Sequence, residues 1–416
     1  MWWLERKPEL TAGHKRTLRA LTVDESGPGT IRHDFAALLA FVRGRDLPLS
    51  KAYHLLPLKV LPAINALLSR PIEVRLQRPQ LKSYPHIQGL YLLLRATGLG
   101  QIGETPARPA LAVDEGLHDA WLALNPAEQY FTLLETWLLR GRPEIVGEHE
   151  RFEYARQHFA DCAEMMLSIP AEGLPIAGND YAIGYVLYSP GRMSMALMEL
   201  FGLLAVEHGQ PVEGEGWQIA RVHRTPWGEA VFALLYEELF SDYDKVRELE
   251  DAAQPPFGVL QPAFAPYVPQ WQGNLRPPSW AFREGGYVFK ATLWRGLWRQ
   301  IAIDGGAPLD DLAGAILDAY AFMHDHLYRF SYRNRFGVEE RINHPDMDEG
   351  PWADEVRVGD VPLTMGQSMT YLFDFGDQWE FEVTLERIDP PERAPYRPVI
   401  LDGRGGAPEQ YPSGDE

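Results

Sequence analysis

Imidazole and carboxylate side chains gather in the last third of the sequence, near a predicted helix end and a predicted turn. His324 and His326 follow the helix, whereas Asp374, Asp377 and Glu380 surround the turn. Carboxylates combined with imidazoles are typical of divalent-metal hydrolases and nucleases. If the helix end met the turn in the fold, these five side chains would form such a site.

Four of these residues also have a structural explanation that needs no reaction. Gly376-Asp377 has the composition of a tight turn, and Asp374 can accept hydrogen bonds from backbone amides there. Glu380 is expected on a solvent-facing side of a strand, and His326 can cap a helix end. We therefore expect no catalytic residue, no metal and no other cofactor. A metal-dependent hydrolase or nuclease in the C-terminal domain is the alternative function.

The segment around the turn has the clearest periodic pattern in the sequence. In 379–386 the apolar residues Trp379, Phe381, Val383 and Leu385 alternate with polar and acidic ones. This alternation predicts a strand with one buried face and one wet, acidic face. Residues 371–375 alternate in the same way, so the whole segment predicts a hairpin. Its turn is expected to be a two-residue type II′ turn at Gly376-Asp377.

Further elements precede this hairpin. Residues 287–303 contain two strand-like runs, YVFKATL and WRQIAI, and apolar residues at helical spacing predict a helix from about Leu309 to Phe322. Another strand is expected over Leu327–Tyr332. Residues 287–416 are thus predicted to form a compact α+β domain with an antiparallel sheet and one main helix. The protein as a whole is assigned to the α+β class, with a mainly helical N-terminal region.

Several short motifs in this domain resemble those of one known family. The motifs are Trp298-Arg299, Asp325-His326-Leu327-Tyr328 and the run from Tyr371 to Glu380 with its Asp374-Phe375-Gly376-Asp377 turn. In these motifs and their order, the domain resembles the plasmid pRiA4b ORF-three-like family over roughly residues 287–412. Members of this family are also labelled as insertion-element passenger proteins. The resemblance implies a compact α+β domain associated with mobile elements, without an established reaction. The candidate functional cluster is Arg299, His326, Tyr328, Asp374, Asp377, Trp379 and Glu380.

Two positions depart from the pattern of that family. Phe381 stands after Trp-Glu, where the family commonly has a histidine, and Ala407-Pro408 stands where the family often has Cys-Pro. If the family used those side chains to hold a metal, this chain would have lost two ligands. A metal role in the domain is thereby weakened.

The N-terminal region contains two segments with the order helix, hairpin, helix. In the first, a helical stripe ends at Gly98, two apolar runs (Ala110–Val113 and Ala120–Leu124) follow, and a helix starts at Asn125-Pro126. In the second, a helix ends near Gly202, residues 217–223 alternate like a strand, and a helix starts at Thr225-Pro226. This order predicts two winged-helix-like units in residues 83–251. A basic helical region (1–82) precedes them, and a Pro-rich linker (252–286) follows.

Charge is distributed unevenly along the chain. Residues 1–110 hold 16 Lys and Arg against 8 Asp and Glu, residues 111–286 hold 11 against 26, and residues 287–416 hold 12 against 24. The basic first quarter could bind DNA or RNA, or it could pack against the acidic remainder of its own chain. The acidic C-terminal domain could dock a protein partner.

Composition excludes several other classes of protein. The single cysteine, Cys162, rules out an internal disulfide framework and a Cys-rich zinc site. No apolar run has the length of a signal peptide core or a membrane span, so we expect a cytoplasmic protein without a membrane partner. No phosphate-binding glycine loop and no Gly-x-Ser-x-Gly motif is present. These observations favour a non-catalytic binding protein that is associated with nucleic acid and has the C-terminal domain as interaction module. The family resemblance adds the expectation of a link to mobile elements.

Overall fold

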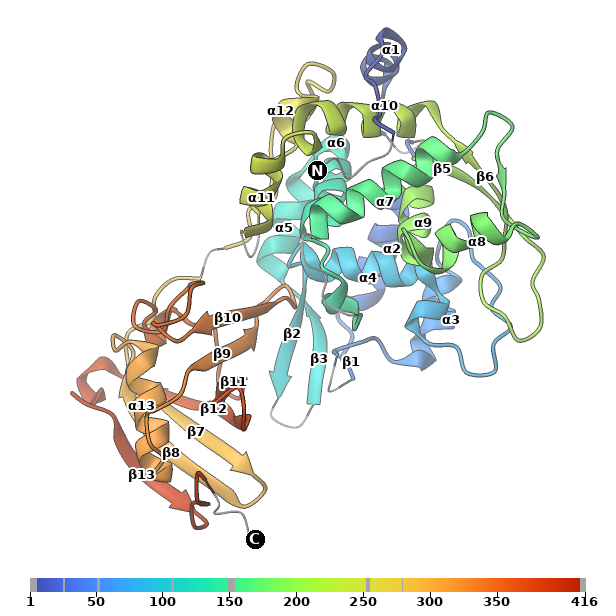
Figure 1. Cartoon of the computed structure of the whole chain (residues 1–416). Coiled ribbons are helices and arrows are strands. Elements are labelled where there is room, and N and C mark those ends of the chain that lie inside the picture. The colour runs from blue at the N-terminus through green and yellow to red at the C-terminus, as the bar shows by residue number, and fades with distance from the viewer. Residues whose placement is uncertain are drawn as a thin grey trace. The chain divides into compact units, whose positions relative to one another are not determined.

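The chain divides into two compact units (Figure 1). Unit 1 comprises Met1–Gly103 and Arg108–Pro277, and unit 2 comprises Glu104–Ala107 and Pro278–Glu416. The computed structural model describes residues 6–24, 27–50, 53–105, 108–148, 154–251, 255–278 and 280–411. Unit 1 is mainly helical and unit 2 is built on a large sheet, which confirms the predicted α+β class. Among the described residues, no helix is long and apolar enough to cross a membrane.

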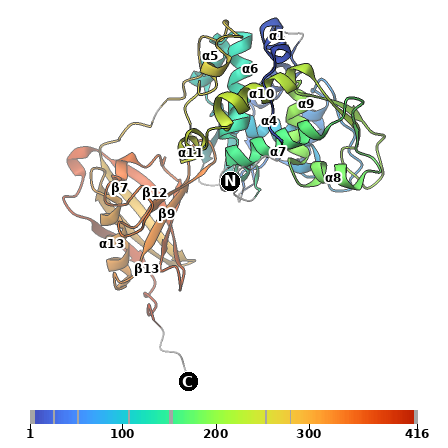
Figure 2. The same cartoon turned by 45° about the horizontal axis from the view of Figure 1, so that its top comes forward.

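Helix α4 (Pro85–Ala96) is the central element of unit 1, and all of its residues are buried. Pro85 occupies the first turn, where its missing amide hydrogen costs no helical hydrogen bond. Gly89 lies against Leu197 of helix α9 (Gly191–Leu200), and a Cβ atom at Gly89 would come within 2.6 Å of the Leu197 side chain. The glycine therefore lets α4 and α9 approach closely. Figure 2 shows both helices inside the helical body of unit 1.

The order helix, hairpin, helix occurs twice in unit 1. Helix α4 is followed by Gly98 and by strands β2 (Gly100–Thr105) and β3 (Arg108–Val113); helix α9 is followed by Gly202 and by strands β5 (Leu204–His208) and β6 (Ile219–Arg224). Both glycines have positive φ, which a glycine adopts without strain at a helix end. The order expected from the sequence is thus present in both segments. The winged-helix class of these segments stays a prediction.

The second helix of each repeat also follows a shared pattern. Helix α6 (Pro126–Glu135) starts after Asn125, and helix α10 (Pro226–Leu235) starts after Thr225. Each of these two side chains accepts a hydrogen bond from a backbone amide of the first turn. Each helix then continues into a π-helical turn, at residues 136–140 and 236–240.

One local expectation in the first repeat was wrong. The helix, hairpin, helix interpretation places the run Ala120–Leu124 in the second arm of a hairpin. The run lies largely within helix α5 (Glu115–Ala123) instead. The Asp114 side chain caps this helix by accepting a hydrogen bond from the Leu117 amide at 3.0 Å. The hairpin is instead formed upstream, between β2 and β3.

The Pro-rich segment packs onto the rest of unit 1. Phe264, Val268, Trp271 and Leu275 are buried. The Trp271 ring stacks on Phe131 of α6 at a centroid distance of 4.5 Å. Residues 255–277 are therefore part of the folded unit. The other described elements of unit 1 are α1 (Ala12–Ala20), α2 (Ile31–Val42), α3 (Leu61–Asn65), α7 (Tyr154–Ser168), α8 (Asp180–Leu187), α11 (Tyr243–Asp251), α12 (Gln261–Phe264), β1 (Leu47–Pro48) and β4 (Leu174–Pro175).

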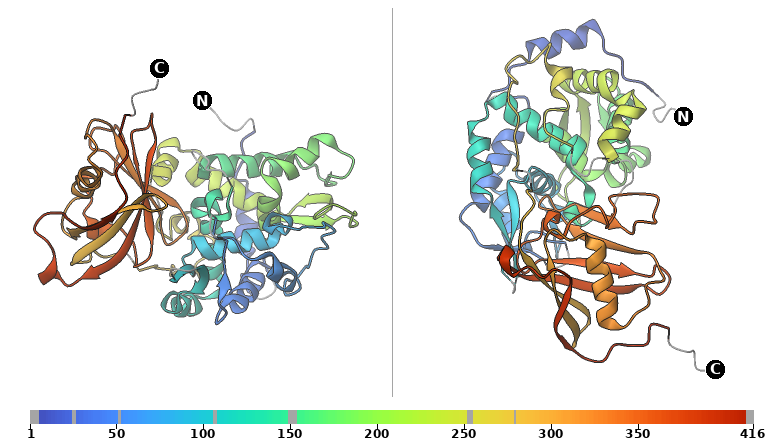
Figure 3. Two further views of the ribbon diagram at one scale, coloured as in Figure 1. Left: turned by 90° about the horizontal axis from the view of Figure 1, so that it is seen from below. Right: turned by 90° about the vertical axis from the view of Figure 1, so that its left-hand side faces the viewer.

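Unit 2 contains a seven-stranded antiparallel sheet in the order β10-β9-β11-β12-β7-β8-β13. Helix α13 (Leu309–Tyr320) lies along the sheet in Figure 3. The strands are β7 (Gly286–Trp294), β8 (Leu297–Asp304), β9 (Tyr328–Arg333), β10 (Glu339–Asn343), β11 (Ser368–Phe373), β12 (Trp379–Asp389) and β13 (Val399–Arg404).

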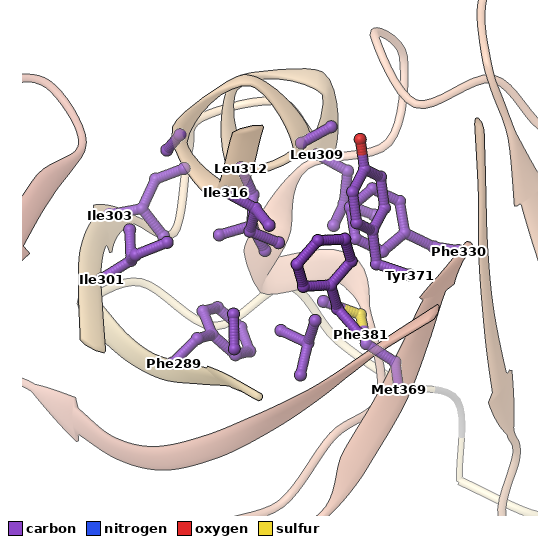
Figure 4. Close-up of a cluster of buried hydrophobic side chains, with 14 of the residues drawn as sticks. Phe289, Ile301, Ile303, Leu309, Leu312, Ile316, Phe330, Met369, Tyr371 and Phe381 are labelled. Carbon is purple, nitrogen blue, oxygen red and sulfur yellow. The ribbon is translucent and has the colours of Figure 1, made fainter. Parts of the chain in front are cut away.

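The core of unit 2 lies between α13 and the sheet. Figure 4 shows Leu309, Leu312 and Ile316 of the helix among side chains of the strands, including Phe330 and Phe381. In β12 the side chains of 381, 383 and 385 are buried, whereas those of 380, 382 and 386 are exposed. This confirms the alternation that predicted the strand.

The turn of the final hairpin differs from the expected one. Strand β11 ends at Phe373, which pairs with Trp379 at the start of β12, so five residues (374–378) connect the strands instead of two. Asp374 and Gln378 have positive φ values of 57° and 54°. The Asp374 side chain stabilises the longer turn, because its Oδ1 accepts a hydrogen bond from the Gly376 amide at 2.8 Å.

Candidate functional site

A cavity of about 760 Å³ borders one face of α13 in unit 2. Residues 310, 311, 314, 315 and 318 of the helix line it at the spacing of a single helical face. Gly314 and Ala315 are small, which leaves room above the helix at this point. Leu317 of the same helix also lines the cavity. The other lining residues come from the start of β9 with the segment before it, the residue after β10, and β13 with the segment before it, and are His324, His326, Tyr328, His344, Tyr396, Arg397, Pro398 and Ile400.

The helix contributes three carboxylates to this cavity, and two of them contact other lining residues. The Tyr328 hydroxyl donates a hydrogen bond to Oδ1 of Asp310. Burial, followed by this bond and the charge of Asp310, raises the pKa of Tyr328, so the phenol stays protonated as a donor. Nε2 of His324 lies 3.1 Å from Oδ1 of Asp318. Asp311 is exposed, and the cavity lining thus holds three carboxylates against one arginine, Arg397.

Two residues of the candidate cluster line the cavity, and a third lies next to it. Nε2 of His326 is 3.4 Å from Oδ2 of Asp374, so the helix end does meet the turn. Asp374 is already engaged by the Gly376 and Asp377 amides. Its position therefore agrees with a role in shaping the turn.

The other four residues of the candidate cluster lie in structural positions. Arg299 donates hydrogen bonds to the backbone oxygens of residues 319, 404 and 405, and its guanidinium lies 4.7 Å from the Tyr320 ring centre. It thus joins α13 to the end of β13. The Trp379 ring packs edge-on against Phe322 at 4.9 Å. Asp377 and Glu380 are exposed, in the turn and on the wet face of β12.

Sequence reasoning missed the carboxylates of α13 as site residues. Asp310 and Asp311 lie in the first turn of the helix, where acidic residues are common because they complement the helix dipole. Asp318 lies two turns further on the same face. The spacing of the three aspartates could have indicated one acidic face of the helix. The position of Tyr396 and Arg397 beside that face could not, because they belong to a distant segment that only the fold brings to the cavity.

The structure offers little support for a metal site in unit 2. Within the described parts of that unit, no three His, Cys, Asp or Glu side chains place their ligand atoms within 4.8 Å of one another. The described residues contain one such group, and it lies in unit 1: His86, Glu199 and His208.

The sheet of unit 2 ends in a strongly exposed strand beside the cavity. All six residues of β13 are exposed, and β13 pairs on one side only, with β8. The apolar residues Val399, Ile400 and Leu401 are 44%, 50% and 45% exposed, and Tyr396 just before the strand is 97% exposed. Ile400 also lines the cavity. An open, apolar strand edge and an acidic cavity thus adjoin each other.

Comparison with known proteins finds one family model that matches part of unit 2. The family described as plasmid pRiA4b ORF-3-like protein matches residues 291–412, as expected from the motifs. A crystal structure of a protein of unknown function from Methanosarcina mazei Go1 is similar at 26% sequence identity; the match covers 30% of this chain and 71% of that chain, with a TM-score of 0.27. No curated protein matches the chain.

Proposed function

We propose that this protein, whose unit 2 carries a plasmid pRiA4b ORF-3-like domain, is a non-catalytic binding protein, and that this domain docks an extended, basic segment of a partner protein. The observation that carries the proposal is the open apolar edge of β13 beside the acidic cavity over α13.

The two edges of the sheet differ in a way that favours β13 as the docking edge. An unpaired strand edge presents free backbone groups to which another strand can add, and charged side chains normally protect such edges. Strand β10 at the opposite edge carries Glu339, Glu340 and Arg341. Strand β13 carries Asp402 and Arg404 in its second half, but its first half exposes three consecutive apolar residues, Val399–Leu401. Strand addition is a common mode of peptide recognition.

The cavity next to β13 determines the charge of the expected partner. Asp310 already accepts the Tyr328 hydroxyl, whereas Asp311 and Asp318 are exposed carboxylates on the same helical face. Tyr396 offers an exposed aromatic ring over which a lysine or arginine head group can lie. Carboxylates combined with an aromatic ring favour a cationic side chain as the occupant.

A peptide titration tests this proposal. A fluorescent peptide of alternating lysine and valine is added to the full chain, and anisotropy reports binding; a glutamate–valine peptide is the charge control. The lysine peptide is expected to bind, more weakly as salt rises. The Asp311→Asn, Asp318→Asn double variant should bind it about two- to thirtyfold more weakly, because each of the two exposed charge pairs contributes about 0.2–1 kcal/mol.

The matched control for this titration is Glu382→Gln, which removes an exposed carboxylate from β12 in the interior of the sheet. Its affinity should equal that of the wild type. Equal affinity of the double variant and the wild type would show that the cavity carboxylates do not contribute to binding. Absence of binding would contradict the docking function itself.

Nucleic-acid binding by the basic first quarter is the second candidate function. The excess of Lys and Arg in residues 1–110 favours it. Part of this charge is used inside unit 1: Arg43 pairs with Glu115 at 2.7 Å, Arg70 lies 3.2 Å from Glu199, and Arg95 is buried. Binding of the full chain to duplex DNA and to RNA across a salt series tests this function. A steep loss of affinity with salt would support it, and no binding at low salt would exclude it.

The alternative of a metal-dependent hydrolase or nuclease in the C-terminal domain has less support. It would need several of the His and Asp side chains around the cavity to converge on one ion, and the described residues of unit 2 show no such convergence. His324 and His326 instead face different carboxylates, those of Asp318 and Asp374.

A further inference from the structure

Two histidines and one glutamate converge in the interior of unit 1. His86 lies in the first turn of α4, Glu199 in the last turn of α9, and His208 at the end of β5. Nε2 of His86 is 2.9 Å from Oε2 of Glu199, and Nε2 of His208 is 3.0 Å from Oε1 of the same carboxylate. The ligand atoms of the three residues all lie within 4.8 Å of one another.

The surroundings hold these side chains in place and shield them from solvent. The side chains of His86 and Glu199 are only 3% and 7% exposed, and that of His208 is 27% exposed. The Trp217 ring packs edge-on against both imidazoles, at 4.7 Å and 5.5 Å. Nη1 of Arg70 is 3.2 Å from Oε1 of Glu199. The three groups are therefore held in place by contacts with Trp217 and Arg70.

We propose that His86, Glu199 and His208 bind one divalent transition-metal ion, with Zn²⁺ the first choice. Imidazole and carboxylate are ligands that zinc and neighbouring transition metals accept. Both Nε2 atoms lie within 3.0 Å of the carboxylate, so an ion with bonds of about 2.0–2.2 Å could bind between the imidazoles and the carboxylate in place of these hydrogen bonds. Arg70 would then act as an outer donor that orients the carboxylate.

Three protein ligands leave at least one coordination position for another group. A cavity of about 220 Å³ adjoins two of the three ligands, because His86 and Glu199 line it together with Arg70. Thr30, Asp34 and Thr225 also line it. The open position would face this cavity, where water or a small anion next to Arg70 could complete the coordination.

The location of the site gives metal binding a structural consequence. His86 belongs to the first helix of one repeat and Glu199 to the first helix of the other, and α4 packs directly on α9. An ion bound to both helices would link the two repeats. It would therefore stabilise unit 1 against unfolding in proportion to its affinity and concentration.

The decisive experiment is calorimetric titration of the full, chelator-treated chain with Zn²⁺, compared with a His208→Ala variant. The wild type is expected to bind one equivalent with an affinity at least about tenfold above that of the variant, since losing even an outer-shell partner typically costs ten- to a hundredfold. Titration with Co²⁺ should give the visible absorption of a nitrogen- and oxygen-ligated ion, and Zn²⁺ should raise the melting temperature of the wild type but not that of His208→Ala.

The matched control is His223→Ala in the adjacent strand β6. His223 also pairs with a glutamate, Glu207 at 2.7 Å, but is absent from the group of three. This variant should bind Zn²⁺ like the wild type. Glu199→Gln provides a second test that keeps the size of the side chain, and circular dichroism checks the fold of each variant. Equal Zn²⁺ binding by the wild type and His208→Ala, or no tight equivalent of Zn²⁺, Co²⁺, Ni²⁺ or Mn²⁺ in the wild type, would overturn the proposal.

Discussion

The hydroxyl of Tyr328 in β9 donates a hydrogen bond to Oδ1 of Asp310 in α13, and so connects the sheet to the helix at the acidic cavity of unit 2. The bond occupies one of the three carboxylates that α13 presents there. The two exposed carboxylates of this face are those of Asp311 and of Asp318, and Asp318 also lies 3.1 Å from Nε2 of His324. A basic partner segment is thus expected to depend on these two residues.

Removing the hydroxyl in Tyr328→Phe should destabilise unit 2. The substitution leaves the ring packing in place and deletes a partly buried hydrogen bond to a charged acceptor, which costs about 1.5–3 kcal/mol. Urea denaturation followed by intrinsic fluorescence measures the change. Tyr396→Phe is the control, because Tyr396 is 97% exposed. Loss of its hydroxyl should leave the free energy of unfolding unchanged. Equal stability of both variants would show that the bond to Asp310 contributes nothing.

A charge placed on the open edge should weaken docking without affecting the fold. Ile400→Lys puts a cation on a half-exposed position of β13 that also borders the cavity. Repulsion of a lysine–valine peptide and the protective effect of an edge charge both predict several-fold weaker binding. Anisotropy measures the affinity, and thermal unfolding checks the fold. Val212→Lys, at a position of similar exposure in unit 1, should bind the peptide like the wild type; if both variants bound alike, β13 would not be the docking edge.

The buried carboxyl of Glu135 should make the stability of unit 1 depend on pH. Burial raises the pKa of Glu135 to about 7, although hydrogen bonds from the Gly258 and Leu260 amides and the charge of Arg140 act in the opposite direction. The folded state thus holds the proton more tightly than the unfolded chain, whose glutamates titrate near 4.5. The resulting stability is complete below pH 4.5 and is lost as the pH rises to about 7.

Comparison with Glu135→Gln isolates this effect from that of other titrating groups. The unfolding free energy of the wild type should fall relative to that of the variant by about 3 kcal/mol across this pH range, since each pKa unit corresponds to about 1.4 kcal/mol. Chemical denaturation at a series of pH values measures it. A constant difference between the two proteins would mean that the folded carboxyl titrates at its ordinary pKa.

The close packing of α4 on α9 should make Gly89 sensitive to a single methyl group. In Gly89→Ala the new Cβ would come within 2.6 Å of the Leu197 side chain, and overpacking of this kind costs about 1–3 kcal/mol. Gly184→Ala in α8 is the control, because no atom lies within 4 Å of its Cβ position and alanine favours a helix by about 1 kcal/mol. The melting temperature should fall for the first variant and stay or rise for the second. A rise for both would mean that the helices can separate at no cost.

Local sequence patterns were sufficient to predict those elements that neighbouring residues specify. The alternation over 379–386 gave the buried face of β12, and the Asn125-Pro126 and Thr225-Pro226 pairs gave the starts of α6 and α10. The same locality explains the error in the final turn. Alternation extended through Phe375, whereas the hydrogen bonds of the Asp374 side chain favour a five-residue turn that ends the strand two residues earlier.

The sites could not be predicted in this way because they depend on contacts between distant segments. His86, Glu199 and His208 have no shared motif, and they meet only because α4 packs on α9 and β5 folds back beside them. The acidic cavity likewise combines a helical face with Tyr396 and Arg397, whose positions depend on the course of the chain before β13. The seven residues suggested by the family motifs do not form one site. They lie at the cavity, at the turn and near the end of β13.

Photo-crosslinking of the lysine–valine peptide to the full chain tests the proposed docking function most directly. A diazirine in place of one valine side chain marks what the bound peptide touches, and mass spectrometry of the digest locates it. We predict crosslinks to Val399–Leu401 and Tyr396, competed by unlabelled peptide. Crosslinks confined to β10 or to unit 1 would contradict the assignment of β13 and the adjoining acidic cavity as the partner site.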